Sequence, residues 1–541
     1  MGASDNTVAD VIAQACARHG VKNAFGMPGG GSSLDLIAAF ARVGIAFRLC
    51  RTETGAMLMA AADAEIRNAF GVAIVTQGPG TASAMNGLAY ASLDRAPVLF
   101  ISDGWTPRQR AFDTHQVFDQ RAMSAPVVKA SSRLESIDAR AELEALIDRM
   151  LAAPWGPVHI ELTGENARRV VAGDAVARTV LEAPRAADAP PGDAHALLRA
   201  ARRPVLLVGL EARDEGASAQ VLALAAQLQC PVLTTYKAKG IVSDESPWTV
   251  GHFTGGAAES DCIAAADLIV LCGMDPVELI GRPWPYAAPV LDVALVRHPV
   301  HYVRPAAGLY GRLATGLRSL LAACMRSDWS GAEIDAYRRA MLTRIAYHGE
   351  DAGAGLSPQQ VVESALRVAG PQRPAIAVDA GAHMFSAMAF WRATSAGGAL
   401  ISNGLATMAF ALPAGIARAL NSPDVPTIAF TGDGGLMMCA GELATAVQYG
   451  VRLCVVVFND GALSLIALKQ RNRQMADAGV TWPRTDFAAV ARGFGMTGFS
   501  VDSVAGYEDA LRAAMQAEGP CLIDVQVDPS GYRSQATALR G

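Results

Sequence analysis

One strand–turn–helix–strand unit occurs twice in this chain, and it constrains the fold more than any other feature. The first copy, at 71–103, reads GVAIVTQGPGTASAMNGLAYASLDRAPVLFISD, with an apolar strand that enters a glycine turn. The second copy, at 426–460, reads PTIAFTGDGGLMMCAGELATAVQYGVRLCVVVFND and has the same order. Short β-rich runs alternate with longer Ala- and Leu-rich runs elsewhere, which is typical of parallel α/β domains. The two copies therefore predict two similar α/β domains.

Two breaks divide the chain. The stretch 164–194 is rich in Pro, Ala and Asp, and the stretch 324–360 is a polar helical run that ends in a glycine-rich loop. The predicted domains are 1–175, 190–325 and 358–541, each of ordinary size for an α/β domain. Hydrophobic residues make up 51% of the chain and charged residues 18%, so each domain can bury a sizeable core. The predicted fold class is α/β, with three doubly wound parallel sheets.

Composition argues against several classes of partner. The formal net charge of −5 shows no basic bias, so nucleic acid and anionic membranes are not expected partners. No uncharged stretch is long enough to span a bilayer, and the N-terminal segment has the pattern of an amphipathic helix rather than of a signal peptide. The 9 cysteines are scattered without a CxxC pair, which predicts reduced core thiols in a cytoplasmic protein.

The two copies of the repeated unit differ at the centre of the turn. The turn 78–80 contains Pro79, whereas the matching turn 432–434 contains Asp433. A carboxylate at the C-terminal end of a parallel strand lies where α/β folds bind ligands. The glycines around it let a ligand approach the backbone, and the start of the next helix favours an anion. This combination indicates a divalent cation that bridges Asp433 and a diphosphate.

The next strand supplies a second oxygen donor. It ends at Asn459, in the loop adjacent to the turn that carries Asp433. Magnesium takes one or two protein oxygens, with phosphate and water completing its shell. The alternative is an aspartate that caps a helix and an unrelated asparagine at a strand end. Because the two residues stand at matching strand ends, the metal site is the favoured interpretation.

The middle domain contains two further strands that enter glycine turns, at 202–212 and 266–276. Dinucleotide-binding folds have such turns, but neither sequence is a GxGxxG. Whether this domain binds a nucleotide stays open at this point.

The GDG turn, followed by an asparagine after one helix and one strand, resembles the thiamine diphosphate motif. With the motifs below, the chain resembles the acetolactate synthase and 2-oxoacid decarboxylase superfamily, whose chains contain a pyrimidine-binding, a middle and a diphosphate-binding domain. The resemblance implies thiamine diphosphate and Mg2+ as cofactors. It also implies that Asp433, Asn459 and the backbone carbonyl of Gly461 are the metal ligands.

Glu53, in the segment CRTETGAMLMAAADA at 50–64, matches the activating glutamate of this family. By this resemblance its carboxyl group bonds the aminopyrimidine N1′ of the cofactor and so promotes loss of the proton at C2 of the thiazolium ring. The alternative is a helix-start carboxylate without a catalytic role, because acidic residues are favourable at helix N-termini.

Two more segments resemble cofactor-binding loops of the family. The segment 402–420 resembles a Gly-Leu-Gly-Thr-Met-Gly stretch in which Ala406 and Ala409 replace glycines, and its Met408 would be the wedge that bends the cofactor. The segment 378–385 resembles the loop that grips the diphosphate. The cofactor contacts that the resemblance implies are Pro79, Gly381, Ala382, His383, Ala406, Met408, Gly432, Gly434 and Gly435.

Two loops, at 25–36 and 113–120, resemble those that the first domain of the family lays over the thiazolium. The candidate residues in these loops are Gly30, Gly31, His115 and Gln116. Gln116 matches a family glutamine near the bound intermediate. His115 stands where many relatives have phenylalanine, and it fits a surface residue equally well.

Lys469 stands where biosynthetic acetolactate synthases have a tryptophan that selects the acceptor ketoacid. A lysine there favours an anionic substrate, or it is a solvated residue on a surface helix. The flavin segments of those enzymes would fall at 250–261 and 273–286, where the match is poor. We therefore expect no FAD.

The resemblance predicts an enzyme that decarboxylates a 2-oxoacid and joins the product to a second carbonyl compound, as acetolactate synthases do. The alternative is a non-ligating decarboxylase of a 2-oxoacid or an acyl-CoA 2-oxoacid. An NAD-dependent oxidoreductase is disfavoured because the chain lacks GxGxxG, and a non-catalytic scaffold because Glu53, Asp433 and Asn459 occur together. Since Glu53 and Asp433 lie in different predicted domains, we expect a homodimer or homotetramer with the site at the subunit interface.

Overall fold

The computed structural model of this protein describes residues 6–171, 191–279, 283–299, 302–349, 355–371 and 373–540. Contacts divide the chain into two compact units. The first comprises Met1–Glu182, Ile416–Asn421 and Cys439–Tyr449, and the second comprises Ala183–Gly415, Ser422–Met438 and Gly450–Gly541. Two helical segments from late in the sequence therefore pack with the N-terminal part of the chain.

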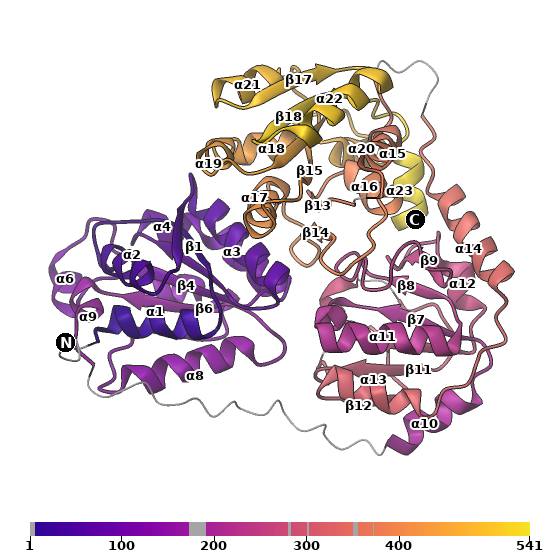
Figure 1. The fold of residues 1–541 in the computed structure, drawn as a ribbon, viewed down its shortest axis with the longest axis horizontal. Helices are drawn as coiled ribbons and strands as arrows, with labels where there is room; N and C mark the ends of the chain where they lie inside the picture. The colour runs from indigo at the N-terminus through magenta and orange to yellow at the C-terminus, as the bar shows by residue number, and fades with distance from the viewer. Residues whose placement is uncertain are drawn as a thin grey trace. The chain divides into compact units, whose positions relative to one another are not determined.

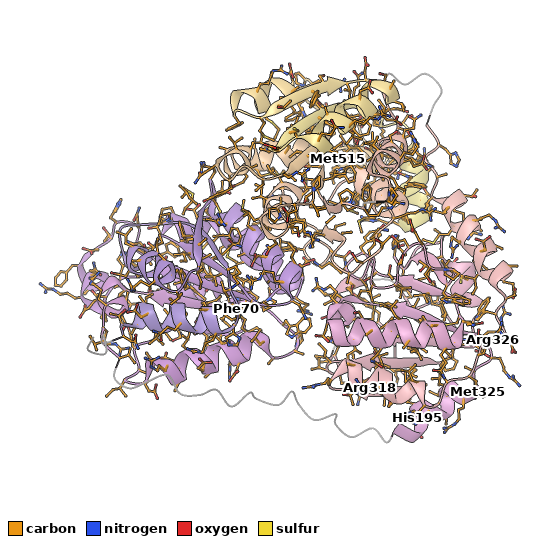
Figure 2. All side chains as sticks on the ribbon, viewed as in Figure 1. Phe70, His195, Arg318, Met325, Arg326 and Met515 are labelled. Atoms are coloured by element: carbon orange, nitrogen blue, oxygen red, sulfur yellow. The ribbon has the colours of Figure 1, made fainter. Side chains whose placement is uncertain are left out.

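Six parallel strands form the sheet of the first unit, in the order β2-β1-β3-β4-β6-β5. Strands β1, β4 and β6 are labelled in Figure 1. The strands are β1 Asn23–Met27, β2 Ala46–Leu49, β3 Gly71–Val75, β4 Val98–Asp103, β5 Ser131–Ser132 and β6 Val158–Leu162. The longer helices are α1 Val8–Arg18, α2 Ser32–Arg42, α3 Glu53–Arg67, α5 Met85–Leu93 and α8 Ala139–Leu151. Every residue of β3, β4 and β6 is buried, as expected for a parallel sheet covered on both faces. Phe70, labelled in Figure 2, belongs to this core.

The C-terminal sheet belongs to the second unit and has the order β14-β13-β15-β16-β18-β17. Its strands are β13 Ala375–Val378, β14 Ala399–Ile401, β15 Thr427–Gly432, β16 Leu453–Asn459, β17 Thr497–Val501 and β18 Cys521–Gln526. Helices α15 Pro358–Ala369, α16 His383–Phe390, α17 Ala411–Asn421, α18 Asp433–Cys439, α19 Glu442–Gln448, α20 Ser464–Asn472, α21 Phe487–Gly493, α22 Val504–Gln516 and α23 Tyr532–Arg540 follow this part of the chain. Counted along the chain, its strands have the same order as those of the first sheet. The repeat seen in the sequence therefore extends to the whole sheet.

The middle sheet has a different order, β12-β11-β10-β7-β8-β9, which is the order of dinucleotide-binding folds. Its strands are β7 Pro204–Val208, β8 Val232–Thr234, β9 Thr249–His252, β10 Leu268–Cys272, β11 Val290–Ala294 and β12 Ala307–Tyr310. Helices α10 Pro191–Ala200, α11 Glu215–Leu228, α13 Leu313–Leu321 and α14 Gly331–Arg344 accompany them. The strand order reverses between β7 and β10, so the switch point lies between these two strands.

The predicted fold class is confirmed by three six-stranded sheets whose strands are all parallel. The predicted domain limits stay predictions, and those at 175 and 190 fall outside the described residues. Among the described helices, none is long and apolar enough to cross a membrane. The cysteine side chains are buried thiols, as the scattered spacing predicts.

Candidate active site

The GDG turn lies at the C-terminal end of β15, and Asp433 is the first residue of α18. Asp433 is 2% exposed, and its carboxylate accepts hydrogen bonds from Gly434 N and Gly461 N, each at 2.8 Å. Burial raises the pKa of Asp433, and these hydrogen bonds oppose the shift. Gly435 has no room for a side chain, because a Cβ there would lie 2.4 Å from Asp379 Oδ2. The turn thus holds one buried carboxylate with the backbone close beside it.

Two adjacent polar residues at the end of β16 have different surroundings. The amide nitrogen of Asn459 donates to Asp524 Oδ1 at 2.8 Å and to a backbone carbonyl at 2.9 Å, and its Oδ1 atom is buried without a hydrogen-bond partner among the described residues. Asp460 lines the same cavity as Asp433, and its carboxylate accepts from Ser464 Oγ at 2.5 Å. Burial and, to a smaller extent, the Asp433 carboxylate raise the pKa of Asp460 to about 7. Two carboxylates therefore line one cavity.

This cavity has a volume of about 200 Å3 and contains most of the residues expected to bind the cofactor. Its walls include Gly381, Ala382, His383, Ala406, Met408, Gly432, Asp433, Gly434 and Gly435. The His383 ring stacks on Phe458 with 5.1 Å between ring centroids, and its Nε2 atom is buried without a partner among the described residues. Burial lowers the pKa of His383 to about 4. An unpaired ring nitrogen, glycine backbone in the cavity wall and two carboxylates fit a metal-bound diphosphate.

The loop that carries Met408 has an unusual backbone. Ala406 and Ala409 adopt positive φ angles of 52° and 67°, a conformation that costs residues with a Cβ about 1–2 kcal/mol. Asp379, at the end of β13, holds this loop: its carboxylate accepts from Phe410 N at 2.5 Å and from Thr431 Oγ1 at 2.6 Å. Asp379 was not predicted as a site residue. The only feature of the sequence that points to it is its place directly after a predicted strand. The two alanines stand where the family resemblance has glycines, which explains the glycine preference physically.

Glu53 lies in the first unit, at the start of α3 and beside the turn 78–80. A Cβ on Gly80 would lie 3.5 Å from Glu53 Oε1, and Pro79 is the first residue of α4 Pro79–Ser83. The loop with Gln116 packs against the same turn, because a Cβ on Gly78 would lie 2.8 Å from Gln116 Cβ. The structure thus brings Glu53, Pro79 and Gln116 together within one unit. The neighbouring His115 is exposed.

The side chain of Gln120 holds the turn 78–80 in place, and this residue was not predicted from the sequence. The side chain is 1% exposed; its oxygen accepts from Gly78 N at 2.8 Å and from Thr81 Oγ1 at 2.5 Å. Its nitrogen donates to the Asp103 carbonyl at 3.0 Å, which ties the turn to the end of β4. Nothing in the local sequence distinguishes Gln120 from Gln116, because its partners are distant in the chain.

The substrate candidates have unequal surroundings. Gly31 lies against the buried Asp103, since a Cβ there would come within 3.0 Å of Asp103 Cγ, whereas a Cβ on Gly30 would meet nothing within 4 Å. Lys469 is exposed on α20 and does not line the cavity, although the first residues of the same helix do.

At the switch point of the middle sheet, Glu278 occupies the crevice. Its carboxyl group accepts from Leu210 N at 2.9 Å and from Asp275 N at 3.2 Å, and it also bonds Thr235 Oγ1. A Cβ on Gly209 would lie 2.4 Å from the Gly273 carbonyl, so the two glycine turns are in close contact. An acidic side chain therefore takes the backbone N–H group that a phosphate would need here.

Comparison with known proteins places this geometry in a family. Three family models of thiamine pyrophosphate enzymes match the chain. The N-terminal TPP binding domain matches residues 6–123, the central domain 192–320 and the C-terminal TPP binding domain 379–525. An acetolactate synthase of Bacillus subtilis is 27% identical, with 97% of this chain and 94% of the relative covered. A probable 2-ketoarginine decarboxylase of Pseudomonas aeruginosa is 28% identical, with 96% and 94% covered, and a pyruvate oxidase of Lactiplantibacillus plantarum is 28% identical, with 94% and 86% covered. The chain therefore belongs to the thiamine pyrophosphate enzymes, with their N-terminal, central and C-terminal domains, and is a distant homologue of acetolactate synthases and decarboxylases.

Proposed function

We propose that this chain uses thiamine diphosphate and Mg2+ to decarboxylate a 2-oxoacid and to join the resulting fragment to a second carbonyl compound. The cavity that contains Asp433, Asp460 and the unpaired Nε2 atom of His383 carries this proposal, because its donor set fits a metal-bound diphosphate. Acetolactate synthases among the relatives support the ligating reaction. When bound, thiamine diphosphate supplies the electron sink for the bond that breaks as carbon dioxide leaves.

We assign the cation to the carboxylates of Asp433 and Asp460, because both line the cavity and Mg2+ prefers such hard oxygen ligands. The sequence pointed instead to Asn459 and the Gly461 carbonyl. The Asn459 amide is engaged by Asp524, and the Gly461 carbonyl accepts from Trp482 N at 2.9 Å. Asn459 stays the competing ligand, because its Oδ1 atom has no hydrogen-bond partner among the described residues. Separate Asp460→Ala and Asn459→Ala variants distinguish the two assignments.

The protein groups have distinct roles in this proposal. Glu53 would exchange a proton with the aminopyrimidine of the cofactor, and Met408, in the cavity wall, would lie against the cofactor. Gln116 lies on the loop beside the turn 78–80, and we assign it to the substrate. Because Glu53 and Asp433 belong to different units, we propose that two copies of the chain build each site, in a cytoplasmic homodimer or homotetramer.

We propose that the middle domain holds no FAD. The support is Glu278, whose buried carboxyl group bonds the N–H group of the first glycine turn. Absorbance of the purified protein between 350 and 500 nm, roughly the flavin range, tests this point.

A non-ligating decarboxylase is the second candidate, because a probable 2-ketoarginine decarboxylase is as similar to this chain as the acetolactate synthases are. Incubation with thiamine diphosphate, Mg2+ and single 2-oxoacids, followed by NMR of the products, distinguishes the two. We expect a 2-hydroxy-3-oxo acid or a related ligation product. An aldehyde formed in equal amount to carbon dioxide would support the second candidate, and no carbon dioxide from any 2-oxoacid would refute both.

A further inference from the structure

A buried carboxylate in the first unit binds the two residues that precede Glu53. Glu442 is the first residue of α19 and is 0% exposed. Its Oε1 atom accepts from Thr52 N and Thr52 Oγ1, each at 2.9 Å, and both of its oxygens lie 3.2 Å from Arg51 N. Its Oε2 atom also accepts from Thr445 Oγ1 at 2.7 Å. Among the described residues no cation pairs with Glu442, so its charge is stabilised by hydrogen-bond donors on this segment and on its own helix.

Most backbone N–H groups between the end of β2 and α3 bond side chains of α19 or of Tyr449 at its end, whereas Cys50 N donates to Gly26 O of β1 at 2.9 Å. Strand β2 is at the edge of its sheet, so the residues after it have no strand partner on one side. The hydroxyl group of Tyr449 accepts from Leu49 N at 2.6 Å, and Glu442 accepts from Arg51 N and Thr52 N. Side chains of Glu442 and Tyr449 thus bond the backbone of three of the four residues directly before Glu53.

Thr52 transmits this order to the helix that begins with Glu53. It is the N-cap of α3: its Oγ1 atom accepts from Gly55 N at 2.9 Å while the hydroxyl donates to Glu442. An N-cap fixes where a helix starts, and here the first helical residue is Glu53. Gly55 is required for this contact, because a Cβ there would lie 2.3 Å from Glu442 Oε1.

We propose that Glu442 is a positioning residue for the proton-transfer step: it fixes the N-cap of α3 and thereby sets the place of the Glu53 carboxylate. This inference rests on the proposed function, since it assigns a catalytic use to Glu53. We assign Glu442 no contact with cofactor or substrate.

Glu442→Gln tests the contact directly in the apo-protein. A glutamine keeps the shape of the side chain, but an NH2 group at the Oε1 position cannot accept hydrogen bonds. It would face three donors there, namely Arg51 N, Thr52 N and the Thr52 hydroxyl group. Loss of charged hydrogen bonds at a buried site should speed amide exchange of the segment 48–55 by about 10- to 100-fold in hydrogen-exchange mass spectrometry. The matched control is Thr445→Val, which removes the bond to Oε2 and leaves both contacts to Thr52 intact.

The same variants then test the catalytic consequence in the loaded protein. Glu442→Gln should still bind thiamine diphosphate, but the C2 proton should exchange about 10-fold or more slowly by NMR, with a changed pH profile. Thr445→Val should exchange at the wild-type rate. A role confined to stability would lower the melting temperature without changing the exchange rate per bound cofactor.

A second pair of variants keeps the test decisive if Glu442→Gln does not fold. Thr52→Val removes the hydroxyl that links Glu442 to the helix start, and Thr52→Ser retains it. We expect slow C2 exchange in the first and normal exchange in the second. Wild-type exchange in both Glu442→Gln and Thr52→Val, with cofactor bound, would overturn the inference. Absence of C2 exchange in the wild type would refute the proposed function instead, and amide exchange in the apo-protein would still report on the Glu442 contact.

Discussion

Glu278→Gln should stabilise the protein at neutral and alkaline pH. Glu278 is 8% exposed, and burial raises its pKa to about 8, with a smaller contribution from the charge of Asp275 and opposition from the hydrogen bonds of Thr235 and Leu210 N. A glutamine can donate its amide N–H to Thr235 and accept both backbone N–H groups with its oxygen. The substitution therefore reproduces the protonated acid without its titration.

The expected magnitude follows from the pKa difference between the folded and unfolded chain. The folded protein keeps a proton that the unfolded chain releases near pH 4.5, so the free energy of unfolding falls as the pH rises from 4.5 to about 8. At about 1.4 kcal/mol for each pKa unit, the shift from 4.5 to about 8 should cost the wild type about 5 kcal/mol in total once the pH exceeds 8. Glu278→Gln should lack this loss and exceed the wild type by about 3 kcal/mol near pH 7.

Urea unfolding at several pH values measures this difference, with fluorescence and calorimetry followed in parallel because a chain of several domains can unfold in steps. Glu518→Gln provides a matched control, because it makes the same substitution at an exposed carboxylate. Equal pH dependence in Glu278→Gln and wild type, or a less stable Glu278→Gln at pH 8, would show that Glu278 does not carry a raised pKa that costs stability.

Three further predictions concern the candidate site. Glu53→Gln should bind thiamine diphosphate yet slow C2 proton exchange by about 10^2- to 10^4-fold, measured by NMR; exchange at the wild-type rate would remove the activating role. Ala409→Gly should raise the free energy of unfolding by about 0.5–1 kcal/mol, because its positive φ suits glycine, whereas Ala414→Gly inside α17 should lower it by a similar amount. A loss of stability in both variants would contradict this. Inactive Glu53→Gln and Asp433→Ala chains, mixed and re-equilibrated, should regain activity in mixed dimers; no recovery, with wild-type controls intact, would show that each chain builds its own site.

The sequence predicted the architecture because its signals are local. Apolar runs that enter glycine turns mark the ends of parallel strands, and the repeat at 71–103 and 426–460 recurs as one strand order in two sheets. Asp433 could be predicted for the same reason, because the turn directly follows its strand in the sequence. Family motifs pointed to residues on the segments 378–385 and 402–420. In the structure these residues line one cavity.

The residues that sequence reasoning missed depend on strand register and on distant partners. Asn459 and Asp460 are adjacent, and which of them lines the cavity depends on β18: Asp524 lies opposite Val457, two residues before Asn459, so Asn459 and Asp524 share a face of the sheet. Glu442 and Thr52 are 390 residues apart in the chain. No local pattern reveals such a contact, because it forms only when the units fold.

Titration calorimetry of thiamine diphosphate into metal-free protein, with and without Mg2+, tests whether a cation holds the cofactor at Asp433 and Asp460. We expect one cofactor bound per chain only when Mg2+ is present. We also expect that Asp433→Ala and Asp460→Ala weaken this binding by about 100-fold or more, because each loses a carboxylate ligand, while Asn459→Ala weakens it less. Tight binding that does not need Mg2+, or that survives in Asp433→Ala, would contradict the metal site. No binding to the wild type with Mg2+ would contradict the proposed thiamine diphosphate-dependent function.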